Sequence, residues 1–443
     1  MNIFALSTGK GPSGIAILRL SGKDSLQISK LITKKNDIKS KEVNLCKFYN
    51  PSNGKIIDEG LLLWSPGPNS YTGEDLAEFH THGSNAVVSC FLKVLGEQEN
   101  CRLAEPGEFT KIAFQNNKID LIEAESIGDL IHAETELQRQ QAIKLIQGNA
   151  SNHYNSLREK LVKSLSYIEA KIDFAEDDLP ENVLKEVQAS IKHVHKDIKK
   201  ILEDQKIGEK IRDGFRISII GDVNAGKSSL LNLLSKREAA IVSEQEGTTR
   251  DVIETYLNID GYPVILADTA GIRKVKNKIE KEGIKRAIKK AKDADLTLVM
   301  VDVSKKKINE DLKKLINKDC ILVFNKSDLS KKTPKNEFQK NDQILISVKN
   351  NKNIDSLIKT IKEKLSKKFM KANNILVTRE RHRAKLNAAL KEIEKFLKKN
   401  QKKEIETAAE DLRLATRHLG GIVGKVDVEE ILGSIFQDFC IGK

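Results

Sequence analysis

Apolar residues recur at every third or fourth position, among charged residues, in two stretches of this 443-residue chain, 117–210 and 380–415. That period matches the α-helix and predicts long helices, each with one apolar face. Proline, which interrupts helices, is absent between Pro334 and the end of the chain, and this favours the second stretch. Neither stretch looks complete by itself, and a different pattern separates them.

The pattern between the two helical stretches, over about residues 211–371, is one of short apolar runs bounded by polar segments. We expect a buried strand at each of these runs: Ile217–Ile220, Pro263–Ala267, Ile321–Phe324 and Gln343–Ile346. A helical pattern, Ser229–Leu234, follows the first run closely. Strands that alternate with helices predict an α/β domain with a mostly parallel sheet.

The segment Gly221–Ser228 reads GDVNAGKS, which fits the phosphate-loop pattern G-x-x-x-x-G-K-[ST]. It follows a predicted strand and opens a predicted helix, the context that distinguishes a phosphate loop from a chance match. Backbone N–H groups of the loop and the helix N-terminus would face the phosphates. We expect Lys227 to reach the β- and γ-phosphates and the Ser228 hydroxyl to bind Mg²⁺.

The string Asn325–Asp328, with the sequence NKSD, predicts which base is bound. Asp328 can accept hydrogen bonds from the N1–H and the exocyclic amine of guanine, and adenine lacks this pair of donors. We expect Asn325 to connect this loop to the phosphate loop and Ser347–Lys349 to lie behind the guanine. The site should therefore select GTP over ATP.

Two further strings complete the set that a GTPase needs. Gly247–Asp251, with the sequence GTTRD, predicts the first switch and offers Thr249 as a second Mg²⁺ ligand. Asp268–Gly271, with the sequence DTAG, follows a predicted strand. We expect its Asp to hold Mg²⁺ through water and the N–H of its Gly to meet the γ-phosphate.

The residue that orients the attacking water is not the usual one. Ras-like GTPases use a glutamine just after the Asp-x-x-Gly motif, and this chain has Ile272 and Arg273 there. Glu280, in a lysine-rich stretch that we expect to be the second switch, could reach the water directly or through a second water. On composition alone, a solvated acid at the start of a helix is the alternative.

The positive charge that an arginine finger supplies in other GTPases has two candidate sources. One is a bound monovalent cation, with an oxygen of Asn224 and groups from the stretch 239–249 as ligands. The other is Arg250. The residues alone leave both open.

Composition adds only broad limits. Lys and Arg exceed Asp and Glu by 76 − 63 = 13, and this excess suggests an acidic partner such as tRNA, although lysine runs are usually solvated helix faces. Five cysteines without disulfide or zinc spacing suit a reducing cytosol. Because no signal peptide or long apolar run is found, we expect a soluble, cytoplasmic protein without a membrane partner.

In this order, GDVNAGKSSLLN, EAAIVSEQEGTTRD, DTAG and NKSD resemble the MnmE (TrmE) family of tRNA-modification GTPases. Strings outside the GTPase motifs carry the resemblance more specifically. They are GIAILRLSG (14–22), PGPNSYTGEDLAEFHTHG (66–83), RLAEPGEFTKIAFQNNKIDLIEAES (102–126) and the terminal IFQDFCIGK (435–443). The likeness runs essentially from end to end.

The resemblance implies an α/β P-loop GTPase domain inserted into an α-helical domain and preceded by a small α+β folate-binding domain. Residues 1–116 would dimerise and bind a reduced folate. Residues 117–210 and 372–443 would be the two parts of the helical domain, the second with the terminal Cys-Ile-Gly-Lys. Residues 211–371 would be the GTPase domain.

The motifs and the resemblance together predict the residues of the GTP site. They are Asn224, Ala225, Gly226, Lys227, Ser228, Ser229, Ser243, Glu244, Gln245, Glu246, Gly247, Thr248, Thr249, Asp268, Thr269, Ala270, Gly271, Asn325, Lys326, Ser327, Asp328, Ser347, Val348 and Lys349. The resemblance implies K⁺ ligands at Asn224, Ser243, Gln245 and Thr248. Glu280 falls on the family's catalytic glutamate, twelve residues past Asp268, and this favours the catalytic role over the solvated acid.

The resemblance also implies a site for a tetrahydrofolate derivative, in the 5-formyl or 5,10-methylene form, at Arg19, Glu78, Lys118 and Lys443. A carboxylate suits the 2-amino and ring N–H edge of a pterin, and cations suit the glutamate tail or a polar ring edge. We expect Cys440 to be a packed thiol rather than a covalent group. His80 and His82, which lack an evident third metal ligand, should be structural or pocket-lining.

The function implied by the resemblance is that of a K⁺-dependent GTP hydrolase that is a homodimer. It would join an FAD-containing MnmG-type subunit in a heterotetramer. Together they would add an aminomethyl or carboxymethylaminomethyl group to C5 of the wobble uridine in tRNA, while GTP hydrolysis drives conformational cycling. Two alternatives stay open: a ribosome-assembly or RNA-binding GTPase, and a switch module that only docks partners.

Overall fold

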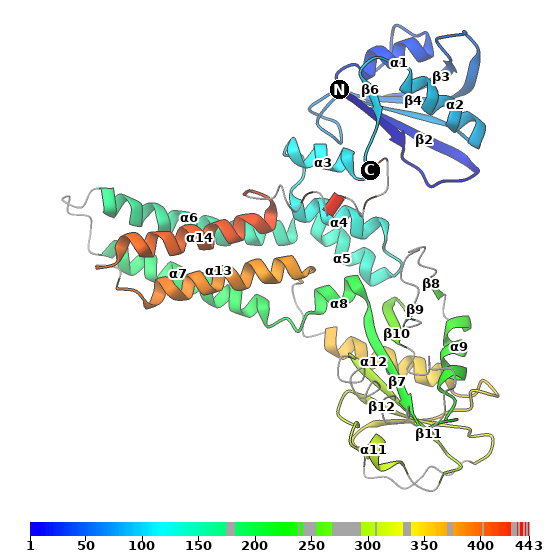
Figure 1. The fold of residues 1–443 in the computed structure, drawn as a ribbon, viewed down its shortest axis with the longest axis vertical. Helices are drawn as coiled ribbons and strands as arrows, with labels where there is room; N and C mark the ends of the chain where they lie inside the picture. The colour runs from blue at the N-terminus through cyan, green and yellow to red at the C-terminus, as the bar shows by residue number, and fades with distance from the viewer. Residues whose placement is uncertain are drawn as a thin grey trace, which may run out of the picture. The chain divides into compact units, whose positions relative to one another are not determined.

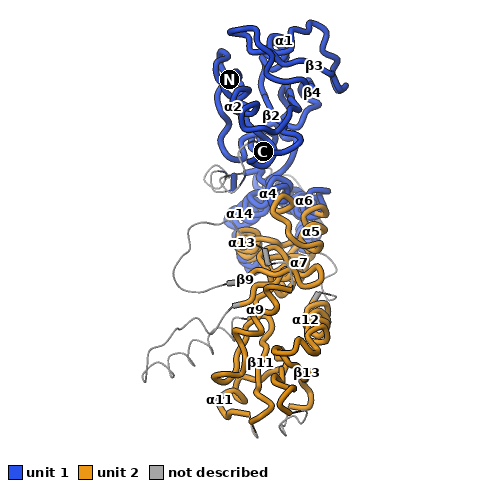
Figure 2. Tube along the Cα trace, turned by 90° about the vertical axis from the view of Figure 1, so that its right-hand side faces the viewer, with its two compact units in different colours: residues 1–128, 145–191, 391–443 blue, residues 129–144, 192–390 orange. Residues whose placement is uncertain are grey.

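The computed structural model describes residues 1–173, 182–237, 240–241, 254–267, 294–305, 308–330, 338–369, 375–400 and 403–426, together with residues 432, 435, 436, 439 and 442. The chain divides into two compact units (Figure 2). Unit 1 consists of residues 1–128, 145–191 and 391–443, and unit 2 of residues 129–144 and 192–390. Each unit therefore contains segments that are distant in sequence.

Unit 1 begins with a six-stranded sheet in the order β3-β4-β5-β2-β1-β6 (Figure 1). Its strands are β1 (Asn2–Leu6), β2 (Ser13–Ser21), β3 (Val43–Tyr49), β4 (Ile56–Ser65), β5 (Leu76–Gly83) and β6 (Cys101–Leu103). Neighbouring strands are antiparallel, except that β1 and β6 are parallel. Helices α1 (Ser25–Thr33) and α2 (Asn85–Gly96) pack on one face, where apolar side chains from alternate strand positions form the core.

The opposite face of this sheet is only partly covered. Helix α3 (Glu108–Gln115) packs there through Phe109. Elsewhere on this face, apolar side chains such as Leu61 remain exposed. Arg19 and Glu78 pair across β2 and β5, and Arg19 also contacts the ring of Phe109. These two charged residues therefore lie where the covered part of the face meets the open part.

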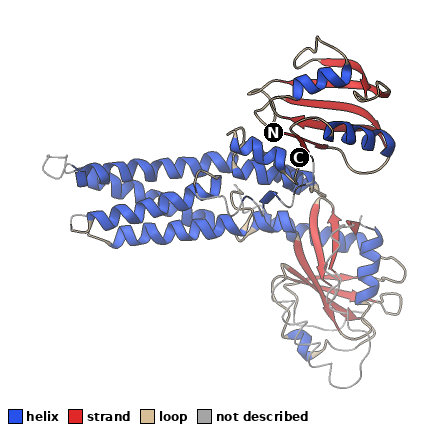
Figure 3. Ribbon diagram, turned by 45° about the horizontal axis from the view of Figure 1, so that its top comes forward, coloured by secondary structure: helices blue, strands red, loops and turns tan. Residues whose placement is uncertain are grey.

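Beyond this sheet and its helices, the described parts of unit 1 are mainly helical (Figure 3). Helices α6 (Asn149–Asp173) and α14 (Ile405–Val423) lie side by side although they come from distant parts of the chain (Figure 1). An ion pair of 2.6 Å between Arg413 and Glu169 joins them. Four helices run from one unit into the other: α4 (Leu121–Ile131), α5 (Glu136–Ile146), α7 (Asn182–Leu202) and α13 (Glu380–Lys398).

Unit 2 contains a seven-stranded sheet in the order β13-β12-β11-β7-β10-β9-β8. Its strands are β7 (Phe215–Gly221), β8 (Ala240–Ile241), β9 (Glu254–Ile259), β10 (Tyr262–Ala267), β11 (Leu296–Asp302), β12 (Cys320–Asn325) and β13 (Asp342–Leu345). The five strands from β13 to β10 are parallel, and β9 and β8 pair antiparallel at the edge. Helices α8 (Ile207–Asp213), α9 (Lys227–Arg237), α11 (Glu310–Lys313) and α12 (Ile354–Phe369) accompany them.

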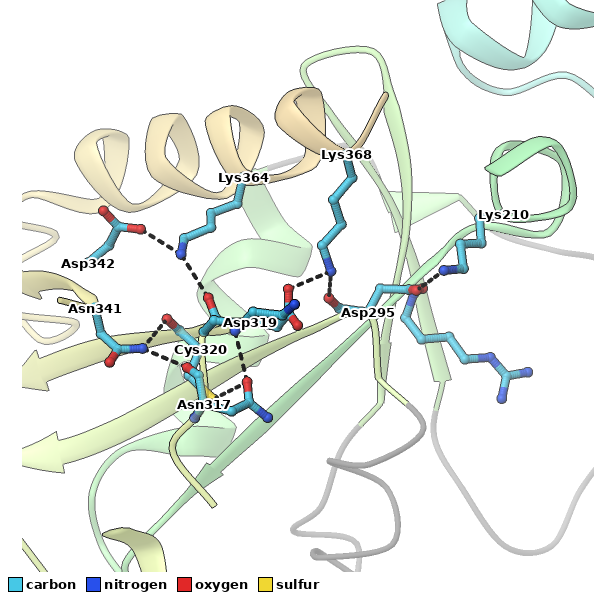
Figure 4. Close-up of polar contacts among 11 residues, drawn as sticks. Lys210, Asp295, Asn317, Asp319, Cys320, Asn341, Asp342, Lys364 and Lys368 are labelled. Carbon is cyan, nitrogen blue, oxygen red and sulfur yellow. Dashed lines mark hydrogen bonds and ion pairs between the residues drawn. The ribbon is translucent and has the colours of Figure 1, made fainter. Parts of the chain in front are cut away.

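The amino ends of the parallel strands are held by a polar network around Asp295 (Figure 4). One carboxylate oxygen of Asp295 lies 2.8 Å from Lys210 Nζ of α8, and the other accepts a hydrogen bond from the backbone N–H of Arg216. The carbonyl oxygen of Asp295 accepts from Lys368 Nζ of α12, which also pairs with Asp319 at 2.9 Å. The network therefore ties α8, which leads into the sheet, to α12, which leads out of it.

Helix α8 is also bound to the helical segments of unit 2. Arg383, of which only 7% is exposed, lies 2.7 Å from Glu209 and 2.8 Å from Asp204. Gln141 of α5 donates a hydrogen bond of 3.0 Å to the carbonyl of Gly208. Burial opposes the charge on Arg383, but the hydrogen bonds to the two carboxylates outweigh that effect and raise its pKa.

The predicted fold class is confirmed: an α/β P-loop domain lies between helical segments of the chain and follows a small α+β domain. The four predicted strands fall within or overlap β7, β10, β12 and β13. The stretch 380–415, predicted as helix, forms two helices because the chain turns between α13 and α14. Of the helices that the structure describes, none is long and apolar enough to cross a membrane.

Candidate functional site

The segment Gly221–Ser228 leaves the carboxyl end of β7 and enters the N-terminus of α9. Gly226 has a φ of +97°, and a Cβ there would lie only 2.4 Å from Asn325 Nδ2, so a side chain is excluded for two reasons. Asn224 is left-handed, with a φ of 62°, and is exposed. A tight loop whose N–H groups precede a helix N-terminus fits a chain of phosphates, and the exposed Ser228 in the first helical turn fits a metal ligand.

The side chain of Lys227, at the end of this loop, reaches back to the first residues of the loop. Its Nζ donates hydrogen bonds of 2.8 Å to the carbonyls of Gly221 and Asp222. A cation is thereby held across the loop. This arrangement favours an anionic ligand in the loop.

Asn325, at the end of β12, binds the phosphate loop to a second loop. Its side chain is buried, with 3% of the residue exposed. Its Nδ2 donates a hydrogen bond of 2.9 Å to the carbonyl of Ala225, and its Oδ1 accepts one of 3.1 Å from the N–H of Val348. One amide therefore fixes the distance between the loop that precedes α9 and the segment Ser347–Lys349.

Asp328 lies three residues farther along and is exposed. The hydroxyl of Ser347 donates a hydrogen bond of 2.5 Å to its Oδ1 and is the main cause that lowers the pKa of Asp328. The backbone N–H of Ser327 donates to the carbonyl of Ile346 and keeps the two loops together. An ionised, oriented carboxylate of this kind can accept from two adjacent N–H donors of a base.

Two contacts near this site were not predicted from the sequence. Lys326 Nζ lies 2.6 Å from Asp302, the last residue of β11. Burial alone would raise the pKa of Asp302, but the hydrogen bonds from Lys326 and Ser304 outweigh it and lower that pKa. Asp222, within the phosphate loop, accepts from Lys305 at 2.9 Å. Asp302 ends β11, a strand that was not among those predicted from the sequence, so the pattern gave no signal for its contact with Lys326.

Much of the predicted nucleotide site lies outside the residues that the structure describes. These predicted site residues are Ser243, Glu244, Gln245, Glu246, Gly247, Thr248, Thr249, Asp268, Thr269, Ala270, Gly271 and Glu280. Arg250, the alternative to the monovalent cation, is outside them as well. The roles of these residues therefore stay predictions. The described part consists of the phosphate loop and two further segments, Asn325–Asp328 and Ser347–Lys349. Asn325 contacts the phosphate loop and Val348, and Ser347 contacts Asp328.

A second candidate site lies on the sheet of unit 1, where Arg19 and Glu78 face each other. Arg19 donates two hydrogen bonds, of 2.9 and 2.7 Å, to the same oxygen of Glu78, Oε1. Its guanidinium also lies against the rings of Tyr71 and Phe109, 5.3 and 5.6 Å from their centroids. These two aromatic residues were not predicted as site residues from the sequence, although both fall in the strings that carry the resemblance.

The other two residues predicted for this site are less direct neighbours. Lys118 Nζ donates a hydrogen bond of 2.8 Å to the carbonyl of Pro68, in the loop that also carries Tyr71. Lys443 lies outside the described residues. The carbonyl oxygen of Gly442, the residue before it, accepts a hydrogen bond of 2.8 Å from the hydroxyl of Ser7 and one of 3.5 Å from Arg19. The described end of the chain thus reaches the edge of this site.

The surface around Arg19 and Glu78 offers a carboxylate with one oxygen bound to an arginine, and aromatic side chains beside it. Such a combination suits a planar ring with N–H donors along one edge. Burial raises the pKa of Tyr71, and its hydroxyl is paired with that of Thr110. His82, the second histidine of the H-x-H string, lies 2.9 Å from Asp58. Within the described ranges, no three His, Cys, Asp or Glu residues gather as a metal site.

Comparisons with known proteins cover the whole chain. The family model of the GTP-binding protein TrmE N-terminus matches residues 2–118, and that of the MnmE helical domain matches residues 121–440. A protein of Pelagibacter ubique named tRNA modification GTPase MnmE is 58% identical over 443 residues and is covered completely, as is this chain. A Rickettsia bellii protein of the same name is 45% identical over 448 residues, which cover 100% of this chain and 99% of that protein.

A solved structure, the G domain of the T. maritima FeoB iron transporter, is 24% identical and covers 34% of this chain and 98% of that one. Its TM-score of 0.25 is too low to support a conclusion.

Proposed function

This chain belongs to the MnmE family, and from that premise we propose that it is a GTPase that acts in the modification of tRNA. The observation that carries the proposal is the alignment, from end to end, with relatives named tRNA modification GTPases. The phosphate loop and the Asp328 loop, which Asn325 joins, support the GTPase part independently. In this scheme residues 211–371 form the GTPase domain within the helical parts 117–210 and 372–443, and residues 1–116 bind the carrier of a one-carbon unit.

GTP hydrolysis would use residues from four loops. Lys227 and the N–H groups of the phosphate loop neutralise the phosphates, and Asp328 selects guanine. Glu280 orients the attacking water as a general base or through a second water. Ser228 and Thr249 would hold Mg²⁺, and Asn224, Ser243, Gln245 and Thr248 would hold K⁺. The two ions would supply the positive charge that phosphoryl transfer requires.

The role of K⁺ predicts that the hydrolysis rate depends on the salt. Because a bound monovalent cation would replace an arginine finger, KCl should raise the rate severalfold over NaCl at the same ionic strength. Glu280→Ala should keep GTP binding and lose most hydrolysis, whereas Arg250→Ala should keep most of it. Equal rates in both salts, with a loss of hydrolysis in Arg250→Ala, would instead identify Arg250 as the source of the charge.

The tRNA part of the proposal places this chain in a homodimer that joins an FAD-containing subunit of the MnmG type. The product would be a wobble uridine with an aminomethyl or carboxymethylaminomethyl group at C5. Its one-carbon unit would come from a tetrahydrofolate derivative at Arg19, Glu78, Lys118 and Lys443. The Arg19–Glu78 pair beside two aromatic rings supports this assignment, because it offers a carboxylate edge and flat walls to a pterin.

The experiment that tests this function is mass spectrometry of tRNA nucleosides from a strain that lacks this gene. We expect the C5-modified wobble uridine to disappear and to return with the wild-type gene, but not with Lys227→Ala, which removes the cation from the phosphate loop. Unchanged nucleosides in the deletion strain, with a defect in ribosome particles, would contradict the proposal and favour the ribosome-assembly alternative.

A further inference from the structure

His80 lies two residues after Glu78 on β5, so both side chains stand on the same face of the sheet. This is the face on which Arg19, the cross-strand partner of Glu78, also lies. His80 Nε2 is buried and has no hydrogen-bond partner among the described residues. It is 3.9 Å from Glu78 Oε2, which is too far for a hydrogen bond.

The two carboxylate oxygens of Glu78 have different surroundings. Its Oε1 accepts both hydrogen bonds from Arg19, and within the described part of the chain no hydrogen bond reaches Oε2. Two polar atoms, Glu78 Oε2 and His80 Nε2, therefore lie near each other without satisfying each other. A buried polar atom without a partner is unfavourable, and such atoms are uncommon in folded proteins.

The surroundings of these two atoms are apolar and aromatic. Ile17 and Leu61 are the cross-strand neighbours of His80 on β2 and β4, and Leu63 is that of Glu78. Tyr71 lies beside Arg19 and packs on the cluster that contains Leu76, two residues before Glu78 on β5. A polar edge bordered by flat and apolar walls suits a planar heteroaromatic ring with donors and acceptors along one side.

We propose that His80 is a positioning residue of the carrier site, and that its Nε2 hydrogen-bonds the polar edge of the pterin ring beside the atoms that Glu78 holds. This inference rests on the proposed folate function. Glu78 Oε2 accepts from the ring N–H or the 2-amino group. His80 Nε2 pairs with the next polar atom of the same edge, as donor or acceptor according to its tautomer.

The test is equilibrium binding of 5-formyl-tetrahydrofolate to the full chain, measured by calorimetry. His80→Phe keeps a flat ring but removes the polar atoms, and we expect it to weaken binding at least about tenfold, the effect of one lost hydrogen bond to a buried partner. His80→Gln keeps a donor and an acceptor at similar reach and should bind within a few fold of wild type. His82→Ala is the matched control, because that histidine is exposed and paired with Asp58.

A second ligand distinguishes the loss of one contact to the pterin from a general disruption of the site. p-Aminobenzoylglutamate carries the tail of the carrier without the pterin, so His80→Phe should leave its weak binding unchanged. Tight binding of 5-formyl-tetrahydrofolate by wild type and by His80→Phe alike would overturn the role of His80 and leave the proposed function standing. Failure of the wild-type chain to bind it would overturn both.

Discussion

At the scale of single residues, Asn325 connects two loops of the nucleotide site. Its amide donates to the carbonyl of Ala225 in a buried hydrogen bond and accepts from the N–H of Val348 in a partly buried one. Asn325→Ala removes both partners, and the buried carbonyl alone loses about 1–3 kcal/mol. We expect GDP and GTP to bind at least about tenfold more weakly.

Titration with a fluorescent GDP analogue would measure this effect. Asn350→Ala is the control, because Asn350 is exposed and takes part through its backbone N–H, which the substitution keeps. If Asn325→Ala binds GDP as wild type does, the connection between the two loops is not needed for the site.

The same residues indicate what the sequence could and could not predict about the site. The phosphate loop and the loop of Asp328 were predictable because each is a contiguous string whose spacing carries the chemistry. The pair of Lys326 with Asp302, and the nearness of Arg19 to Glu78, depend on strand order and register. Register is set by packing of the whole sheet, so no local pattern reports it.

At the scale of elements, the buried charge of Arg383 is one of the contacts that hold α8. The side chains of Arg383, Glu209 and Asp204 are each about 10% exposed, so removing the cation leaves two carboxylates poorly solvated. Loss of one partner from a buried ion pair costs about 3–5 kcal/mol. We therefore expect Arg383→Met to lower the thermal midpoint of unit 2 by several degrees, as measured by calorimetry.

The control for this prediction is Arg413→Met on α14. Arg413 also has two acidic partners, Glu169 and Glu410, but its side chain is 54% exposed. Exposed ion pairs contribute about 0–1 kcal/mol, so this variant should melt close to wild type. Equal shifts for both variants would mean that burial of Arg383 adds nothing to the stability of α8.

The boundary between α13 and α14 is one feature that the apolar pattern missed, as it also missed strands such as β9 and β11. The segment between Lys398 and Ile405 has no glycine or proline, so the helical period continues through it without a visible break. In the structure the turn is closed by polar contacts: the N–H of Asn400 donates to the Glu404 side chain, and the N–H of Glu404 donates to the carbonyl of Asn400. Both contacts join residues four positions apart, so they are local capping interactions, and the spacing of apolar residues does not report them.

At the scale of the whole molecule, unit 1 is built from both ends of the chain. The core of its sheet uses residues from the first part only, up to Cys101. Helix α6, in contrast, packs along α14, where Gly420 allows a close approach to Arg158. The sheet can therefore form without the end of the chain, whereas α6 cannot bury its apolar face until α14 is present.

This difference predicts how truncated chains behave. A chain that ends at residue 403 lacks α14 and should lose hydrogen-exchange protection in α6, while β2 and β5 keep theirs. A chain that ends at residue 426 keeps α14 but lacks Phe436 and Phe439, which pack on α4. It should lose protection in α4 and keep it in α6. If the shorter chain protects α6 as the full chain does, then the pairing with α14 contributes little, and the two ends of the chain fold independently.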